Sequence, residues 1–536
     1  MQIEFILLIL SLLFFISIIA DKIGYKFGVP ALLLFLVVGM LFGSNGVGAL
    51  FGGEGIVIST DVAQALSTVA LCIILFSGGM DTKLADIKSV LGPGITLATL
   101  GVVLTCLITG VMIYWIYGWL NAIVSVSISM AILTAATMSS TDSASVFSIM
   151  RTNGIGLKHN LRPLLELESG ANDPMAYVLT TTMIGVVMAK TQGDISALPI
   201  IQTIVVQLVM GSVLGFAFGE GLVLLMRKVQ LANESLYPIM VLTACIFIFA
   251  TTYYMQGNPY LAVYVGGLII GNNKFTRKRQ TKSFFNGLTW LSQLMMFLML
   301  GLMVHPADFF HLDVWLPCLL ISIVMLIISR PLAVFLCMLP FRKFHLRDNL
   351  MLSWVGLKGA VPIVFAIMCK AAEVPNADLL FNVVFLCTLI SLLVQGTTLS
   401  YVAKQLNLAT PPEKERRLTH FDMDLPDEIQ STAREVEVTA KTLANGATPR
   451  ELDIPPHTLI VMVRRGEDFF IPTGASVLQE GDQLLVISDQ DANEAYQHMT
   501  NEAEEEAQWR AGIKRRARER FYRMTRWLYK NPKEKE

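Results

Sequence analysis

The sequence predicts a polytopic α-helical membrane protein with about thirteen transmembrane helices, followed by a small α/β cytoplasmic domain. Three observations predict it. The 536-residue chain is 54% hydrophobic, with a mean hydropathy of +0.57. Apolar runs long enough to cross a bilayer recur until residue 405. Lysine and arginine gather in alternate loops, which is the pattern that sets the orientation of membrane helices.

The apolar runs define the expected spans. The first, Phe5–Ala20, begins after Glu4 and precedes Lys22 and Lys26, so it reads as an uncleaved span with its N-terminus outside rather than as a signal peptide. We expect spans at residues 4–20, 29–46, 63–79, 92–117, 124–149, 163–188, 199–226, 236–254, 258–272, 288–304, 314–339, 350–371 and 379–403.

The basic residues test this division. The loops after the odd-numbered spans, one to eleven, carry Lys22, Lys26, Lys83, Lys88, Arg151, Lys158, Arg227, Lys228, five residues of 274–282, Arg342, Lys343 and Arg347. The alternate loops have almost none, apart from Lys190 and Lys370. The positive-inside rule therefore places the region after the last span in the cytoplasm.

The sixth span opens with a polar stretch, Arg162–Pro174. A charged side chain at bilayer depth costs a few kcal/mol, so its presence there indicates function. Ser169 and Asp173 are four residues apart and share one helix face, while Glu168 and Asn172 share a neighbouring one. The first pair could hold a small cation through oxygens, and the second could brace it. A polar helix start on the membrane surface is disfavoured, because apolar residues follow at once.

Two spans look broken. Residues 138–146 (MSSTDSASV) interrupt span five, and residues 355–362 (VGLKGAVP) interrupt span twelve. Small polar residues, glycine and proline inside a membrane helix free backbone groups that must be satisfied within the protein or in a wet cavity. The interrupted spans are the fifth and the twelfth, seven spans apart in the order along the chain. This arrangement predicts inverted structural repeats with a binding site near the bilayer midplane.

Charged residues accompany both breaks. Asp142 would face the positive ends of helices and Lys358 the negative ends. For Lys358 we favour compensation of the helix dipoles without contact to an ion. For Asp142 both dipole compensation and ion contact stay open, and an oxygen of the adjacent Thr141 is a candidate ligand.

Arg330 in span eleven is a cation expected to be buried. Its planar guanidinium suits a carboxylate, so Glu168 is the expected partner, with Asn172 as a hydrogen-bonding neighbour. Snorkelling to the cytoplasmic face is disfavoured, because Arg330 lies about 13 Å of helix from the end of its span.

The motifs together resemble the NhaP-type branch of the monovalent cation:proton antiporter family 1, over essentially the whole membrane region. They are TDS (141–143), ESGANDP (168–174), Arg330, GLKGAVPI (356–363), GVPALLLFLVVGMLFG (28–43), LFSGGMD (75–81) and LAVYVGGLIIGN (261–272). The resemblance implies a homodimer in a bacterial inner membrane, each protomer having a dimerisation domain and a core domain that moves like an elevator.

The resemblance also implies roles for single residues. Asp173 matches the ion-binding aspartate, and Ser169, Glu168 and Thr141 match the other cation-coordinating positions. Asn172 matches the neutral partner of that aspartate, Arg330 the stabilising arginine, and Asp142 the aspartate of the broken helix. Many relatives have proline where this chain has Ser143 and arginine where it has Lys358. Both variants are similar to the potassium/proton, cell-volume-regulation subgroup.

The expected chemistry is competition between a proton and an alkali cation at Asp173. Alkali cations prefer oxygen ligands, and burial favours the protonated form of a carboxyl group. Asn172 cannot ionise and Glu168 is expected to be paired, so one proton would exchange for one cation without net charge movement. Potassium is the preferred cation because of the cytoplasmic module, and sodium is the alternative.

Other function classes fit less well. A ligand-gated cation channel is disfavoured, because the sequence has no TVGYG-type filter. An organic-solute symporter is disfavoured, because the site has no second basic residue to bind a carboxylate. An enzyme is not indicated, because the chain has no nucleotide loop, nucleophile elbow or His/Cys cluster. We expect no cofactor beyond the transported ion and no nucleic-acid partner; the partners expected are lipid, a second copy and a small regulator.

The composition changes after the last span. We assign 1–405 to the transmembrane domain, 406–430 to a linker, 431–495 to a cytoplasmic regulatory domain and 496–536 to a charged tail. The domain shows strand patterns at 435–440, 458–465, 468–472 and 483–489, a short helix at 447–454 and a turn at 480–482. It resembles the C-terminal subdomain of potassium-conductance regulators (RCK_C/TrkA_C), modules that pair and bind small ligands, sometimes nucleotides. The tail is either a solvated helix or a lipid-facing one.

Overall fold

The computed structural model divides the chain into two units, Met1–Thr410 and Pro411–Glu536, which we describe separately. The described residues are 4, 8, 11–19, 22, 31–43, 58–120, 126–190, 197–304, 312–341 and 343–410 in the first unit, and 433–438, 443, 447–452, 458–466 and 468–488 in the second. The tail at 496–536 and most of the linker predicted at 406–430 lie outside these ranges.

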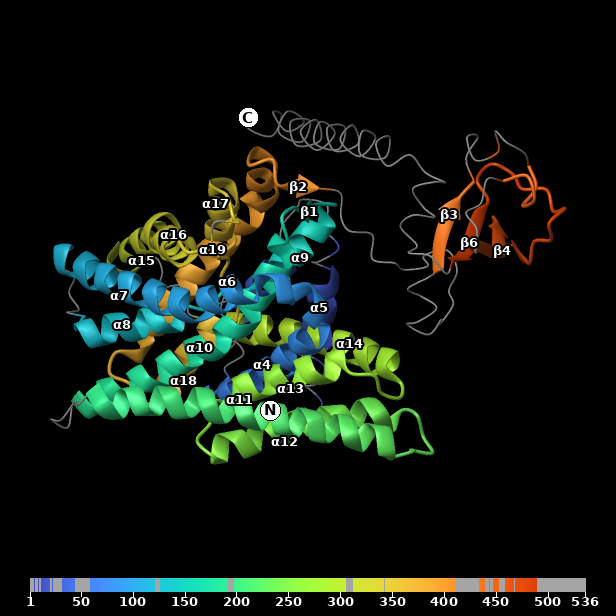
Figure 1. Cartoon of the computed structure of the whole chain (residues 1–536). Coiled ribbons are helices and arrows are strands. Elements are labelled where there is room, and N and C mark those ends of the chain that lie inside the picture. Colours follow the sequence, from blue (N-terminus) through green and yellow to red (C-terminus); the bar gives the residue numbers. More distant parts are fainter. Residues whose placement is uncertain are drawn as a thin grey trace. The chain divides into compact units, whose positions relative to one another are not determined.

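The first unit is a bundle of helices (Figure 1). In chain order they are α2 (Ala31–Phe42), α4 (Thr60–Asp81), α5 (Leu84–Ile87), η1 (Lys88–Val90), α6 (Leu91–Thr96), η2 (Leu97–Gly101), α7 (Val102–Trp119), α8 (Ile128–Thr137), α9 (Ser143–Thr152), α10 (Leu161–Lys190), α11 (Ala197–Lys228), α12 (Leu236–Tyr254), α13 (Pro259–Asn272), α14 (Lys278–Leu302), α15 (Leu312–Val324), η4 (Met325–Ser329), α16 (Arg330–Met338), α17 (Leu346–Trp354), α18 (Val361–Ala371) and α19 (Ala377–Gln405). Among the described residues, 7 helices are long and apolar enough to cross a membrane, which confirms the predicted class.

Both predicted interruptions are present. The chain leaves helical geometry between α8 and α9 and again between α17 and α18. The two irregular segments cross and contact each other. At this contact the backbone N–H of Asp142 donates to the carbonyl of Leu357 at 2.8 Å. The N–H of Lys358 donates to the hydroxyl of Ser391 in α19 at 3.0 Å. The backbone groups freed by the breaks thus find partners inside the protein, as a bilayer requires.

The tenth span is longer than the sequence indicates. We expected it at 288–304, but α14 begins at Lys278. Its basic first turns carry Thr281 and Phe285, both fully buried, and the Phe285 ring packs 5.2 Å from that of Phe76 in α4. An amphipathic start of this kind lacks a continuous apolar run, so a search for apolar spans misses it.

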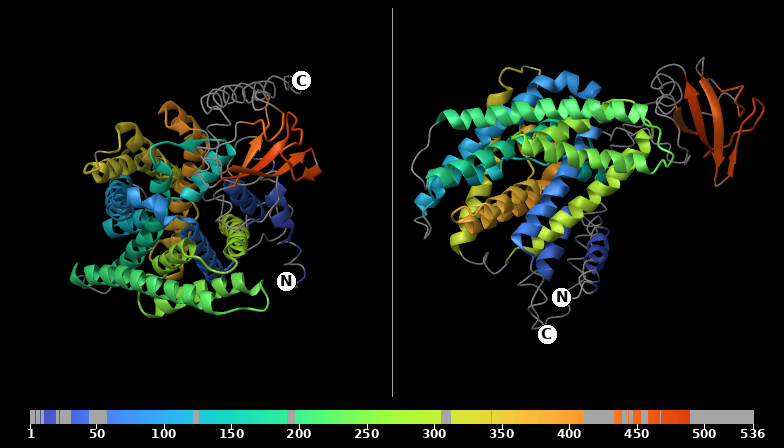
Figure 2. Two further views of the ribbon diagram at one scale, coloured as in Figure 1. Left: turned by 45° about the vertical axis from the view of Figure 1, so that its right-hand side comes forward. Right: turned by 90° about the horizontal axis from the view of Figure 1, so that it is seen from below.

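Glycines let the helices next to the site approach closely. A Cβ atom on Gly267 of α13 would lie 2.2 Å from the carbonyl oxygen of Phe76, and one on Gly79 of α4 would lie 2.3 Å from that of Tyr264. Small residues serve the same purpose at other membrane helix interfaces. The long helices α11 and α12 lie along one edge of the bundle in two views (Figures 1 and 2).

The chain after α19 is tied back to the bundle. Strand β1 (Gly156–Leu157), between α9 and α10, pairs antiparallel with β2 (Ala409–Thr410). The N–H of Lys158 also donates to the carbonyl of Leu408 at 3.0 Å. The predicted linker 406–430 therefore begins with ordered residues, held by the connection that leads into α10. Two residues of strand are too short for a sequence pattern to reveal.

The second unit contains a four-stranded antiparallel sheet. Its strands are β3 (Ala433–Glu437), β4 (Thr458–Arg465), β5 (Asp468–Phe470) and β6 (Gln483–Ser488), in the order β3-β6-β4-β5. The predicted strand patterns correspond to these four strands, and the turn at 480–482 contains Gly481 at φ +90°.

The short helix predicted at 447–454 is wrong over the described residues. Residues 447–452 form turns instead. The Glu451 side chain accepts hydrogen bonds from the backbone N–H groups of Ala447 and Thr448, at 3.1 and 3.2 Å. These bonds, and the bond from the N–H of Leu452 to the carbonyl of Thr448 at 3.1 Å, have the spacing of a first helical turn. Over the described residues the chain forms this turn and not a continued helix.

An ion pair closes this sheet domain. Arg465 donates from Nε to Asp482 Oδ1 at 2.9 Å and from Nη2 to Asp482 Oδ2 at 2.7 Å. Asp482 is buried, and it also accepts from the N–H of Gln479 at 2.8 Å. The Arg465 guanidinium holds the pKa of Asp482 below its usual range. A lowered pKa stabilises the fold above the unfolded pKa of about 3.9, and this stabilisation is lost as the pH falls through the lowered value.

We expect Asp482→Asn to weaken this domain at neutral pH, because it removes the charge from a buried hydrogen-bonded carboxylate. Hydrogen exchange of the β4 and β6 amides in the full chain should become about tenfold faster at pH 7. The ratio of protection between wild-type and variant chains should approach one below about pH 3.9. A constant ratio across that range would show that the charge of Asp482 is not responsible.

Candidate functional site

Asp173 lies in the middle of α10, the helix that opens with the polar stretch. Its side chain is 7% exposed, and its Oδ1 accepts a hydrogen bond from the hydroxyl of Ser140. Ser140 belongs to the irregular segment between α8 and α9. The structure therefore places Asp173 against the first helix break. Ser140 was not among the residues we selected from the sequence, although it lies beside Thr141 in the same polar cluster.

Two further residues of α10 contact the same break. The hydroxyl of Ser169 donates to the carbonyl of Thr141 at 2.8 Å. The amide of Asn172 donates to the hydroxyl of Thr141 at 2.5 Å. Asn172 was expected as a hydrogen-bonding neighbour of Arg330; its amide bonds to Thr141, and its Oδ1 has no hydrogen-bond partner among the described residues.

Ser143, where many relatives have proline, is the first residue of α9. The first helical position suits proline, because its N–H has no partner within the helix. Here the N–H of Ser143 donates to the hydroxyl oxygen of Ser169 at 3.0 Å. A proline could not form this bond. The departure from the common pattern thus adds a link between the broken helix and the site helix.

Asp142 caps the N-terminus of α9. Its carboxylate accepts from the N–H of Ser145 at 3.1 Å and from the Ser145 hydroxyl. This position satisfies a free N–H group of the helix and opposes the positive end of its dipole. A Cβ atom on Gly359 would overlap the Asp142 carboxylate, so glycine is required where the second break passes the first.

Lys358 reaches across from the second break. It is 2% exposed, and its Nζ donates to the carbonyl of Ser140 at 2.8 Å. Its positive charge therefore lies at the carbonyl end of α8, where the helix dipole is negative. The residue whose hydroxyl binds Asp173 is thus held through its carbonyl by Lys358.

Glu168 and Arg330 form a buried ion pair. Arg330 Nη2 lies 2.6 Å from Glu168 Oε1, with both side chains at most 5% exposed. Arg330 follows the π-helical turn η4 and precedes Pro331. A π turn frequently occurs at functional positions in a helix. The pair joins α10 to α16 beside the crossing of the broken helices.

The exposure of α10 differs just before and just after Asp173. Arg162, Glu166 and Gly170, toward the start of the helix, are partly accessible, whereas all five residues from 174 to 178 are buried. Aromatic rings pack against α10 on the side after Asp173. The Tyr177 ring lies 4.9 Å from that of Tyr260, whose ring lies 5.1 Å from that of Phe249 and 6.4 Å from that of Phe365.

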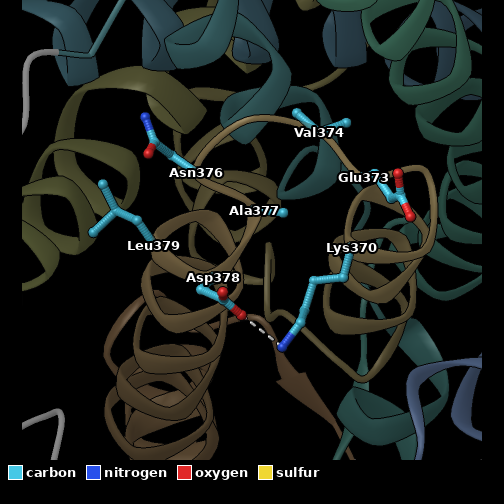
Figure 3. Close-up of a pocket in the computed structure, with 7 residues that line it drawn as sticks. All are labelled: Lys370, Glu373, Val374, Asn376, Ala377, Asp378 and Leu379. Carbon is cyan, nitrogen blue, oxygen red and sulfur yellow. Dashed lines mark ion pairs between the residues drawn. The ribbon is translucent and has the colours of Figure 1, made fainter.

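A separate depression lies at the connection between α18 and α19 (Figure 3). Lys370 and Asp378 pair across it at 2.7 Å, and Asp378 is largely exposed. None of the residues that line it belongs to the predicted site.

The arrangement around Asp173 offers hard oxygen ligands for a cation. They are the Asp173 carboxylate, the hydroxyls of Ser140 and Ser169, and the oxygens of Thr141. Alkali cations prefer such ligands. Among the described residues, no group of three or more His, Cys, Asp or Glu could hold a metal ion.

Comparisons with known proteins agree with this geometry. Residues 8–405 match the model of the transmembrane sodium/hydrogen exchanger family, and residues 433–499 match that of the TrkA-C domain. This chain belongs to the sodium/hydrogen exchanger family.

Relatives within the family are similar over most of their length. The K(+)/H(+) antiporter NhaP of Alkalimonas amylolytica is 39% identical over 484 residues, which cover 89% of this chain and 78% of that protein. The K(+)/H(+) antiporter NhaP2 of Shewanella sp. (strain ANA-3) is 35% identical over 500 residues, covering 93% of this chain and 83% of that protein.

The fold has a solved counterpart. The sodium proton antiporter MjNhaP1 of Methanocaldococcus jannaschii matches with a TM-score of 0.61 at 21% identity, over 74% of this chain and 100% of that one. The family is one of transporters, as the sequence led us to expect.

The buried ion pair makes a prediction about stability. Arg330→Leu leaves the Glu168 carboxylate buried without its partner, which should lower the free energy of unfolding by about 3–5 kcal/mol. The double variant Glu168→Leu/Arg330→Leu removes both charges and should recover much of that loss. Thermal unfolding in detergent measures both, and a double variant as unstable as the single one would contradict this explanation.

Proposed function

We propose that this chain exchanges a potassium ion for a proton at Asp173, across a bacterial inner membrane. The observation that supports this most directly is the contact between Asp173 and Ser140 at the first helix break. It puts a buried carboxylate beside the irregular backbone at which inverted-repeat transporters bind their ions.

Competition at one carboxylate accounts for exchange. When Asp173 is ionised, its charge and the oxygens of Ser140, Ser169 and Thr141 can hold a cation. When it is protonated, the favourable charge is lost and the cation leaves. Proton and cation therefore exclude one another, and each crosses the membrane while the other is absent.

The second carboxylate of the site supports electroneutral exchange. Glu168 is engaged by Arg330, and Asn172, next to Asp173, carries no charge. Asp142 is engaged as the cap of α9. With the other carboxylates occupied, Asp173 carries one proton or one monovalent cation, so a full cycle moves no net charge.

Potassium is the proposed cation, with sodium as the alternative. The relatives that are 39% and 35% identical over most of the chain are named K(+)/H(+) antiporters. The TrkA-C match supports a regulatory ligand on the cytoplasmic domain. We also propose a homodimer, with the N-terminus outside and the C-terminal domain in the cytoplasm, as the basic residues of alternate loops indicate.

The site assignment predicts the effect of one substitution. Asp173→Asn keeps the size of the side chain but removes the group that binds the proton and the cation, so exchange should be abolished. Proteoliposomes with a trapped pH-sensitive dye, given potassium, sodium, rubidium or lithium, measure both activity and selectivity. A normal melting temperature serves as the control for folding, and cation-dependent proton flux in this variant would refute the assignment.

Electroneutrality makes a separate prediction. The membrane potential is worth about 2.3 kcal/mol per charge per 100 mV, so even one net charge per cycle would make the rate respond to voltage. We expect the same exchange rate in proteoliposomes at zero and at about −100 mV, imposed with a gradient of a membrane-permeant anion so that no potassium ionophore is needed. A current on a supported membrane, or a rate that follows the voltage, would refute it.

A further inference from the structure

A buried tyrosine lies directly over the site helix. Tyr264 of α13 packs on Gly170 of α10, where an added Cβ would lie 2.4 Å from its ring carbon Cε2 and 2.7 Å from its hydroxyl oxygen. Tyr264 is 4% exposed, and its hydroxyl makes no hydrogen bond of good geometry among the described residues, its polar neighbour there being the Thr82 side chain. A buried hydroxyl without a well-formed hydrogen bond is uncommon and costs free energy, so it calls for an explanation.

Helical spacing places this hydroxyl about one turn before Asp173, toward the start of α10. Glu166, Gly170 and Asp173 are separated by four and three residues and therefore share one face of α10. The Tyr264 hydroxyl, lying over Gly170, stands between the two carboxylates. Both Glu166 and Asp173 are near enough to interact with it electrostatically.

Glu166 connects this position to water. Its side chain is 29% exposed, and its Oε1 accepts from Arg162 Nε at 3.0 Å. Asp81 and Asp86 lie near enough to add to its negative potential, and Asp81 also contacts Lys282 at 3.5 Å. The positive-inside rule assigns this end of α10 to the cytoplasm. Carboxylates therefore lie at the cytoplasmic approach to Asp173, interspersed with the basic side chains of Arg162 and Lys282.

We propose that the Tyr264 hydroxyl and the Glu166 carboxylate form a waiting position for an alkali-metal cation between the cytoplasm and Asp173. The proposal rests on the proposed function, in which Asp173 is the exchange site. A cation loses its water ligands in steps, and a hydroxyl with a carboxylate can replace some of them midway. Such a position must bind the ion strongly enough to admit it and weakly enough to release it. The partial exposure of Glu166 and its pairing with Arg162 keep the binding weak.

The test uses everted membrane vesicles, in which the cytoplasmic face of the full-length protein points outward. Potassium is added outside, and a pH-sensitive dye reports the exchange rate. Tyr264→Phe and Glu166→Gln should each raise the half-saturating potassium concentration about fivefold, the effect of losing one modest ligand. The maximal rate should change little, because Asp173 is intact.

Three comparisons separate a ligand from a packing residue. Tyr117→Phe removes another buried hydroxyl without a well-formed hydrogen bond, in α7, and should leave half-saturation unchanged. In right-side-out vesicles, Tyr264→Phe should also have no effect on half-saturation by potassium added at the outer face. The variant Tyr264→Phe/Glu166→Gln should show less than the product of the single effects, because both groups serve one ion.

An unchanged half-saturation in Tyr264→Phe, an equal shift in Tyr117→Phe, or the same shift from either face would overturn the waiting position. Asp173→Asn, measured in parallel, separates this failure from failure of the proposed function. If Asp173→Asn is inactive while Tyr264→Phe behaves as wild type, the waiting position alone is wrong. If Asp173→Asn still exchanges ions, the exchange site itself is wrong.

Discussion

The hydrogen bonds between α10 and the first helix break are the interaction on which the rest of the site depends. Ser140, Thr141 and Ser143 each bond to a side chain of α10, and these bonds bring Asp173 to the irregular backbone. An interrupted helix in a bilayer must satisfy its free backbone groups within the protein. The polar residues that meet this need are also the oxygen ligands that a cation prefers, so one arrangement serves both purposes.

The two charged residues at the breaks act mainly on the backbone. Asp142 bonds to the start of α9 and Lys358 to the carbonyl of Ser140. For Lys358 this agrees with the dipole compensation favoured from the sequence. For Asp142 the sequence left two roles open, and the structure engages its carboxylate in a helix cap. Glu168 is paired to Arg330, whereas the hydrogen bond that Asp173 accepts among the described residues comes from the neutral hydroxyl of Ser140.

The end of the membrane unit is held against the site helices. The pairing of β1 with β2 joins the chain that leaves α19 to the connection between α9 and α10. The first of these helices is capped by Asp142 and the second carries Asp173. The end of α19 is thus tied to the connection between two helices of the site, through an element that the sequence does not reveal because it is only two residues long.

Much of this protein follows from local sequence. The spans, both breaks, the carboxylates and the strands of the C-terminal domain are visible because apolar runs, buried charges and alternating residues leave patterns along the chain. The sequence alone does not show which polar side chains meet. Ser140 resembles its neighbours in a serine-rich cluster, and Tyr264 resembles any aromatic residue of an apolar helix. Only the crossing of the breaks and the packing of α13 on Gly170 decide their positions, because those contacts join residues far apart in the chain.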